Sequence, residues 1–451
     1  MKTLIKDGII ITQDPQDQVW LKGWLLLEDD RISALGQGEV PAEVTADKTV
    51  NAAGMAVLPG IVDVHTHVCG SLFKGMTEDP VGAFYGLALP MERLLTPETT
   101  YALSMLGAVE CLKAGVTCIN DIYHFMRSTA QAVDELGMRG VLAQKIIETD
   151  LGTIQYNDYT RIPKEGAARV EENCRLIEEY HGRDGRIFCR FGPHATDTVS
   201  VELAKKIVEL GHQYQVGFHI HVAQKDQEVD FLRETYGLTP VEYLKETGLM
   251  GENLIAAHCT CATTEDIRLL EEGGATVAHC AEMYGKRGKF PPIAQLYPSK
   301  VRMAYGTDWV TMDPWTNMRT AIMAARMAGC PNELPDAHVA LRLSTIVPAQ
   351  ALGLGDRIGS LEVGKQADVV LMDLRSPNLV PVFDDPVATI VYNANRHDVD
   401  TVWVAGKMLV ENKKLLPLEE SWVLAEGQRA ASSIYEDYKA GKSGKCWEDE
   451  K

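Results

Sequence analysis

Eight apolar, β-branched segments alternate with amphipathic helical stretches between residues 56 and 307, and this alternation limits the possible folds more than any other feature. The predicted strands are residues 56–65, 116–122, 139–146, 187–193, 216–222, 253–258, 275–280 and 301–307. Strands and helices that alternate in this way form parallel sheets, and eight such units over about 250–300 residues predict an α/β fold of the (β/α)8 barrel type. The alternative is a doubly wound sheet, but no glycine-rich phosphate-binding turn follows a predicted strand.

Sequence typical of β structure returns at both ends of the chain. The first 55 residues are predicted to form short strands separated by Asp and Gly turns, and residues 367–372 and 401–410 predict a further strand and a hairpin. We expect these two regions to pair into one small β-sandwich beside the barrel. The expected division is 1–55 and 356–419 for the sandwich, 56–355 for the barrel and 420–451 for a C-terminal helical tail.

Charge and composition argue against several classes of function. The chain has 451 residues with 44 Lys and Arg against 63 Asp and Glu, which gives a net charge of −19. This acidity argues against nucleic acid or an anionic membrane as a partner. No apolar run reaches the ~18 residues of a membrane-spanning helix, and the first residues lack the apolar stretch of a signal peptide. Ten scattered cysteines are predicted to be reduced thiols, so we expect a cytoplasmic protein.

Histidine and aspartate residues stand at the ends of four predicted strands. His65 and His67 lie at the end of the first strand, His221 in the fifth, His258 at the end of the sixth and Asp308 after the eighth. The carboxyl ends of barrel strands converge on one mouth, where such folds place their active sites. These side chains are therefore expected to lie close together.

The same residue types predict a metal site. His65 and His67 are two residues apart on an extended chain, so their side chains point to the same face and can reach one ion. His221 and Asp308 would complete a set of three imidazoles and one carboxylate, with one position left for water. An open position is typical of catalytic metal sites. We expect one divalent transition metal per chain, zinc in the first place and iron as the alternative.

The segment PGIVDVHTH, residues 59–67, resembles the opening metal motif of the amidohydrolase superfamily. Within it the chain is similar to the cytosine-deaminase-like branch, which includes chlorotriazine hydrolases, guanine deaminase, and S-adenosylhomocysteine and methylthioadenosine deaminases. Further matching stretches are residues 115–121, 191–195, 219–221, 305–308 and 359–368. The resemblance implies a mononuclear Zn or Fe site, hydrolysis at a ring carbon, and a homo-oligomer such as a dimer or tetramer.

The resemblance also implies roles for individual residues. Those that match the metal ligands are His65, His67, His221 and Asp308. Asp308 also matches the base that takes a proton from the nucleophilic water, and His258 matches the histidine that polarises or orients this water. His194 lies in a motif that lines the substrate pocket, where a core position is the alternative interpretation.

The chain departs from this branch in three places. Gln224 stands where the branch normally has a Glu that carries a proton to a ring nitrogen, and an amide cannot carry a proton at neutral pH. The loops at 279–289 and 309–317 also differ. We expect Gln224 to act with Asp308 and His258 in catalysis and to bind the substrate by hydrogen bonds. Further pocket residues are expected to be Trp309, Tyr123 and Tyr284, with ordinary packing as the alternative for each.

These features predict a metal-dependent hydrolase acting at a ring carbon of a purine, pterin, pyrimidine or triazine. The first interpretation is hydrolytic deamination with release of ammonia. The second is removal of chloride or a substituted amine, or hydrolysis of a cyclic amide, which Gln224 favours. The third, a non-catalytic scaffold protein, conflicts with the presence of all four ligands. The basic residues Lys286, Arg287 and Lys289 are interpreted as solvated surface, with attraction of an anionic substrate as the alternative.

Overall fold

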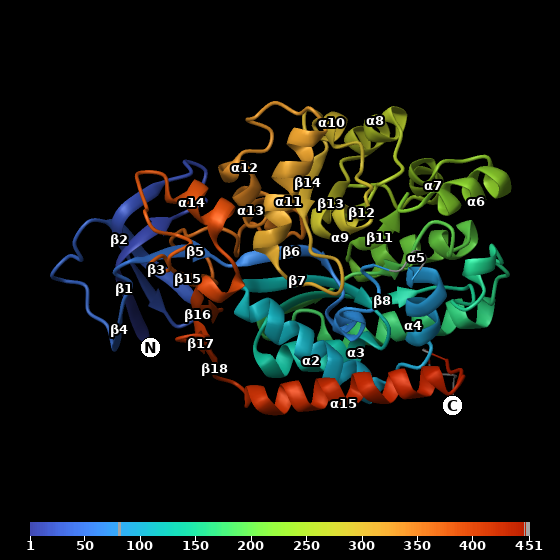
Figure 1. The fold of residues 1–451 in the computed structure, drawn as a ribbon, viewed down its shortest axis with the longest axis horizontal. Coiled ribbons are helices and arrows are strands. Elements are labelled where there is room, and N and C mark those ends of the chain that lie inside the picture. The colour runs from blue at the N-terminus through green and yellow to red at the C-terminus, as the bar shows by residue number, and fades with distance from the viewer. Residues whose placement is uncertain (80–82, 446, 448–451) are drawn as a thin grey trace.

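The computed structural model describes residues 1–79, 83–445 and 447, and it contains a barrel and a separate sheet (Figure 1). The barrel strands are β6 (Ile61–Thr66), β7 (Val116–Tyr123), β8 (Arg139–Ile146), β9 (Ile187–Cys189) continued by β10 (Gly192–Pro193), β11 (Phe218–Val222), β12 (Leu254–His258), β13 (Thr276–His279) and β14 (Arg302–Tyr305). They pair in parallel as two half-sheets, and bridges between Thr66 and Asp308 and between Phe191 and Phe218 join the halves into a ring. The predicted (β/α)8 barrel is confirmed.

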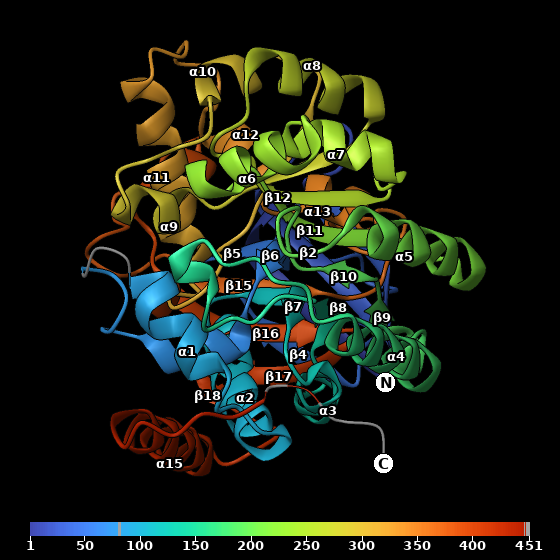
Figure 2. The same cartoon turned by 90° about the vertical axis from the view of Figure 1, so that its right-hand side faces the viewer.

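Helices surround the ring of strands (Figure 2). The longer ones are α2 (Pro97–Lys113), α3 (Met126–Leu136), α4 (Pro163–Tyr180), α5 (Val201–Tyr214), α6 (Asp226–Tyr236), α7 (Pro240–Thr247), α8 (Thr264–Gly273) and α11 (Pro314–Met327). The shorter ones are η1 (Val68–Phe73), η2 (Phe84–Ala88), α1 (Leu89–Glu92), η3 (Ile154–Tyr156), η4 (Arg183–Gly185), α9 (Ala281–Lys286), α10 (Ile293–Leu296), α12 (Ala337–Arg342) and α13 (Ile346–Ala351). Helix α8 begins where Thr263 and Asp266 form a reciprocal capping box, and it ends at Gly274 with φ of +73°.

A nine-stranded sheet built from both chain ends stands beside the barrel (Figure 1, left). Its strands are β18 (Lys414–Leu415), β17 (Lys407–Glu411), β16 (Val399–Val404), β15 (Val369–Asp373), β5 (Met55–Pro59), β1 (Lys2–Ile11), β2 (Val19–Glu28), β3 (Arg31–Gln37) and, beside β1, β4 (Lys48–Asn51). Ile5 and Leu25 from the N-terminal part share a buried core with Val369 and Trp403 from the C-terminal part. The predicted β-sandwich made from both chain ends agrees with this sheet.

The first expected strand, residues 56–65, consists of two strands. β5 pairs with β1 and β15 of the sandwich, whereas β6 pairs with β7 of the barrel. Gly60 separates them, and a Cβ atom there would lie 2.0 Å from the Oγ1 of Thr117. Only glycine therefore fits where the chain passes from one sheet to the other. The Pro59-Gly60 pair at this point is a local turn signal for the break.

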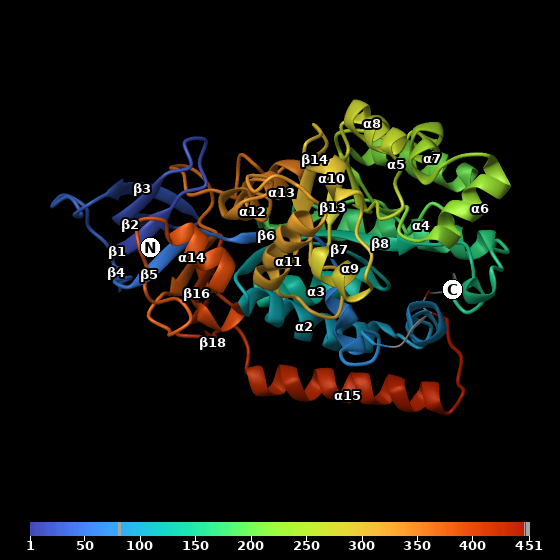
Figure 3. The same cartoon turned by 45° about the horizontal axis from the view of Figure 1, so that its top comes forward.

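After α14 (Pro386–Asn393) and the 3-10 turn η5 (Arg396–Asp398), the chain forms β16–β18 of the sandwich and then returns to the barrel. Helix α15 (Glu420–Lys439) lies along α2 in both side views (Figures 1 and 3), and Glu420 accepts hydrogen bonds from Lys113 of α2. The predicted tail also includes Cys446 and residues 448–451, which lie outside the described residues. In the described part of the chain, no helix is both long and apolar enough to cross a lipid bilayer.

Candidate active site

Three imidazole rings meet at the carboxyl ends of β6 and β11. The Nε2 atoms of His67 and His221 lie only 3.3 Å apart. The Nδ1 atom of His67 lies 2.8 Å from the carbonyl oxygen of Ile122, and the Nδ1 atom of His221 lies 2.5 Å from that of His194. A carbonyl oxygen can only accept a hydrogen bond, so each Nδ1 carries the proton and each Nε2 presents a lone pair.

This arrangement fits a metal ion. Two nitrogen lone pairs that face each other repel unless a cation lies between them. His65 adds a buried Nε2 atom without a hydrogen-bond partner among the described residues, and its Nδ1 lies 2.7 Å from Nε2 of His219. The Oδ1 atom of Asp308 lies 3.6 Å from Nε2 of His65 and 3.4 Å from Nε2 of His67. Imidazoles with one carboxylate are a donor set suited to zinc or iron.

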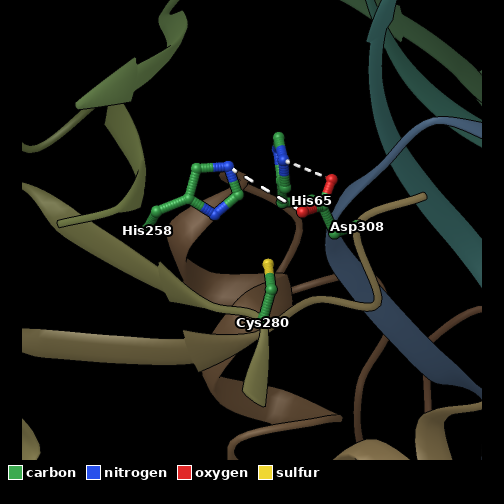
Figure 4. A group of neighbouring side chains, drawn as sticks. All are labelled: His65, His258, Cys280 and Asp308. Carbon is green, nitrogen blue, oxygen red and sulfur yellow. Dashed lines mark ion pairs between the residues drawn. The ribbon is translucent and has the colours of Figure 1, made fainter. Parts of the chain in front are cut away.

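His258 and Cys280 complete the surroundings of Asp308 (Figure 4). The Nε2 atom of His258 lies 4.0 Å from Oδ2 of Asp308, and the ligand atoms of His65, His258, Cys280 and Asp308 all lie within 4.8 Å of one another. Asp308 and His258 have φ of +67° and +80°, a left-handed conformation that is rare outside glycine and recurs at functional sites. Burial raises the pKa of the Cys280 thiol.

Burial largely determines the protonation of these groups. It lowers the pKa of His65, His221 and His258, so these rings are neutral, which is the form that binds a metal. At His67 nearby carboxylates outweigh the effect of burial and raise the pKa. Burial alone would raise the pKa of Asp308, but the close imidazoles of His65, His258 and His67 hold it well below its usual value. The Asp308 carboxylate is therefore ionised and able to accept a proton.

The site opens into a small cavity at the mouth of the barrel. The residues lining it are His67, Phe84, Glu92, Tyr123, Lys145, His194, His221, Gln224, His258, Tyr284, Arg287, Asp308 and Trp309. All five expected pocket residues, His194, Gln224, Trp309, Tyr123 and Tyr284, are in this lining. Aromatic walls with a few polar groups are typical of sites for flat heterocycles.

The Amidohydrolase family matches residues 56–409, which is more than half of the chain. The chain belongs to this family. The predicted superfamily and the prediction of a metal-dependent hydrolase are thereby confirmed.

Relatives of this amidohydrolase carry deaminase names. A 5'-deoxyadenosine deaminase of Methanobrevibacter smithii is 34% identical over 96% of this chain and 98% of its own length. A 5-methylthioadenosine/S-adenosylhomocysteine deaminase of Desulforudis audaxviator is 34% identical over 97% of this chain and 100% of its own. The crystal structure of an adenosine deaminase from Xanthomonas campestris with bound Zn has a TM-score of 0.87 and 29% identity, over 96% of this chain and 98% of that one.

Two charged residues in the cavity of this amidohydrolase were not predicted from the sequence. Lys145 Nζ donates to Glu92 Oε2 at 2.7 Å, and Tyr123 OH donates to Glu92 Oε1 at 2.8 Å. His124 Nε2 lies 2.9 Å from the same Oε2 atom. The sequence does place Lys145 near the carboxyl end of the strand predicted at 139–146, which is a usable signal. Glu92 belongs to no predicted strand or motif, and only the tertiary structure brings it to the site.

The loop that carries Gln224 is fixed by Glu228. The Glu228 carboxylate accepts hydrogen bonds from the backbone N–H groups of Ala223 at 2.9 Å and Gln224 at 2.7 Å, and from the hydroxyl of Thr196. Ala223 has φ of +47°, so the loop needs such support. Glu228 is buried, and it does not line the cavity. It therefore positions Gln224 and is not placed to replace the missing Glu as a proton carrier.

Proposed function

We propose that this amidohydrolase deaminates a purine nucleoside of the adenosine type. Water replaces the amino group on the ring carbon, and ammonia leaves. The observation that carries the proposal is the pair of facing Nε2 atoms of His67 and His221, with the Asp308 carboxylate beside them at the mouth of an aromatic cavity. The deaminase names of the relatives and of the Xanthomonas structure support this substrate class.

The proposed ligands of one divalent metal, zinc first and iron second, are His65, His67, His221 and Asp308. Such an ion supplies Lewis acidity, which lowers the pKa of water toward ~7. The ionised Asp308 carboxylate takes the proton from the attacking water. His258, whose Nε2 lies 4.0 Å from Asp308 Oδ2, orients this water. The Gln224 amide donates a hydrogen bond to a ring nitrogen or carbonyl of the substrate.

Removal of the metal is expected to abolish ammonia release. Zn²⁺ or Fe²⁺ should restore activity to protein dialysed against a chelator, whereas Mg²⁺ should not, because three imidazoles suit transition metals and Mg²⁺ prefers oxygen ligands. Elemental analysis of active protein should give about one such ion per chain. Full activity in protein that contains no Zn, Fe, Mn or Co would contradict the proposal.

The substrate class is tested by ammonia release from adenosine, 5'-deoxyadenosine, methylthioadenosine, S-adenosylhomocysteine, guanine and a chlorotriazine. We expect the adenosine derivatives to react fastest.

A second candidate function is removal of another leaving group, such as chloride, at the same metal site. It is favoured by Gln224, because loss of a neutral amine needs a proton that an amide cannot supply. Release of chloride from the triazine without ammonia from any nucleoside would favour this second function.

Replacement of Gln224 by Glu is expected to lower kcat/KM by about tenfold, because an acceptor oxygen then stands where an N–H donor faces the substrate. The new carboxylate would also lie in a cavity that already holds Glu92 and Asp308. Gln213→Glu is a control that adds the same charge at an exposed position of α5, outside the cavity lining. A kcat/KM at or above wild type for Gln224→Glu would mean that this position requires a proton carrier.

We also propose that the protein is a cytoplasmic homo-oligomer. The nine cysteines that the structure describes are all free, as expected in a reducing compartment. Met323 and Met327, one helical turn apart on α11, and Phe383 are exposed apolar side chains that a contact between copies of the chain would bury. Analytical ultracentrifugation should give the mass of a dimer or tetramer, and a monomer at micromolar concentration would contradict the proposal.

A further inference from the structure

Arg287 lines the cavity, whereas the other two members of the basic loop are engaged outside it. Lys286 pairs with Glu282 at 3.0 Å, and Lys289 pairs with Asp226 at 2.9 Å. Within residues 1–79, 83–445 and 447, the Arg287 guanidinium forms neither an ion pair nor a side-chain hydrogen bond, and Arg287 is one of the cavity-lining residues. The interpretation of this loop as uniformly solvated surface therefore does not hold for Arg287.

Aromatic rings hold the Arg287 guanidinium in place. Its central carbon lies 5.5 Å from the ring centre of Tyr284, 5.6 Å from that of Phe84 and 5.9 Å from that of Trp309. All three rings line the cavity. Contacts with ring faces stabilise the cation but use none of its five N–H donors. The guanidinium is thus pre-oriented and keeps its donors available for a ligand.

Neither of the two carboxylates in the described cavity lining pairs with Arg287. Glu92 already accepts from Lys145, Tyr123 and His124, and Asp308 belongs to the cluster of imidazoles. A second cation, Lys225, lies on the same aromatic patch, with its Nζ 4.4 Å from the ring centre of Phe84. Burial and the charge of Arg287 lower the pKa of Lys225 to about 7. At neutral pH Lys225 is therefore charged in only part of the molecules, and the Arg287 guanidinium is the permanent positive charge that attracts anions in this acidic chain.

Resting on the proposed aminohydrolase activity, we propose that Arg287 binds an oxyanion substituent of the substrate. The preferred substrates are then amino-substituted heterocycles that carry a carboxylate or a phosphate. The planar fork of a guanidinium binds either group through two parallel N–H···O hydrogen bonds. Deamination leaves this group unchanged, so Arg287 contributes to substrate selection and takes no part in proton transfer.

Three probes that differ only at the 5' position test this inference: adenosine, adenosine 5'-carboxylate and adenosine 5'-monophosphate. Each is assayed by ammonia release, with wild type and with Arg287→Met, Arg287→Lys and Lys286→Met. We expect Arg287→Met to lower kcat/KM for at least one anionic probe by about 10–100-fold, as for a lost charge-assisted hydrogen bond, and for adenosine by less than about threefold. Arg287→Lys should recover part of the loss, and Lys286→Met should leave every rate near wild type. A larger effect on the carboxylate or on the phosphate identifies the preferred oxyanion.

The outcomes separate this inference from the proposed function. If wild type deaminates adenosine and Arg287→Met changes the three rates by the same factor or not at all, the inference is wrong and the aminohydrolase function stands. If the metal-loaded protein releases ammonia from no probe and calorimetry detects no binding of the anionic probes, both are wrong. Binding of an anionic probe that weakens about tenfold or more in Arg287→Met, without ammonia release, would support the oxyanion site and overturn the proposed reaction.

Discussion

Replacement of Asp308 by Asn is expected to lower kcat by about 10²–10⁴-fold, the usual contribution of a general base, while the fold stays intact. The carboxylate lies 3.4–3.6 Å from the Nε2 atoms of His67 and His65, and its other oxygen faces His258. An amide of the same shape cannot accept a proton from water, and its N–H group would face these rings in place of an acceptor oxygen. Steady-state ammonia release measures kcat of the variant, elemental analysis measures its metal content, and thermal unfolding measures the stability of its fold.

Asp313→Asn is a matched control for the Asp308 variant. Asp313 lies in the same loop and caps α11 by accepting from the N–H groups of Trp315 and Thr316, a role that Asn performs equally well. This control should keep kcat within about twofold of wild type. If Asp308→Asn turned over within about tenfold of wild type with its metal retained, another group would have to be the base.

The barrel was predictable because its strands are separated by helices with clear ends. The strand expected at 139–146 has those bounds in the structure, and the strand expected at 116–122 extends by one residue as β7. The passage from sandwich to barrel at Gly60 was missed, although the Pro59-Gly60 pair is a local turn signal, because β-branched residues continue on both sides. The close approach of Thr117, which requires glycine at position 60, is a tertiary contact that the sequence does not reveal.

The part of the candidate site whose side chains lie at the ends of strands was predictable from the sequence. His65, His221 and Asp308 stand at such ends, and the sequence alone places them at one mouth. The ion pair between Glu92 and Lys145 depends on two residues that are far apart in the chain. The choice among the three cations of the loop at 286–289 depends on which one meets aromatic rings from other elements. The hydrophobic periodicity of the sequence reveals neither the pairing of Glu92 with Lys145 nor which of the three cations contacts the rings.

Arg139 and Asp368 form a buried ion pair that joins the barrel to the sandwich. Nε and Nη2 of Arg139 donate to the two carboxylate oxygens of Asp368 at 3.1 and 2.9 Å, and both side chains are at most 1% exposed. Arg139 begins β8, and Asp368 immediately precedes β15. The backbone N–H of Ala405 also donates to this carboxylate. The pair thus fixes two sheets whose strands come from opposite parts of the chain.

Replacement of Arg139 by Met is expected to lower the free energy of unfolding by about 3–5 kcal/mol, because the Asp368 carboxylate stays buried without its partner. Urea unfolding followed by circular dichroism measures the loss. Lys205→Met, which breaks an exposed pair with Glu246, should cost no more than about 1 kcal/mol and serves as control. An equal, small cost for both variants would mean that Asp368 finds other donors. Arg139 lies at the opposite end of β8 from Lys145, so kcat of the folded variant should remain close to wild type.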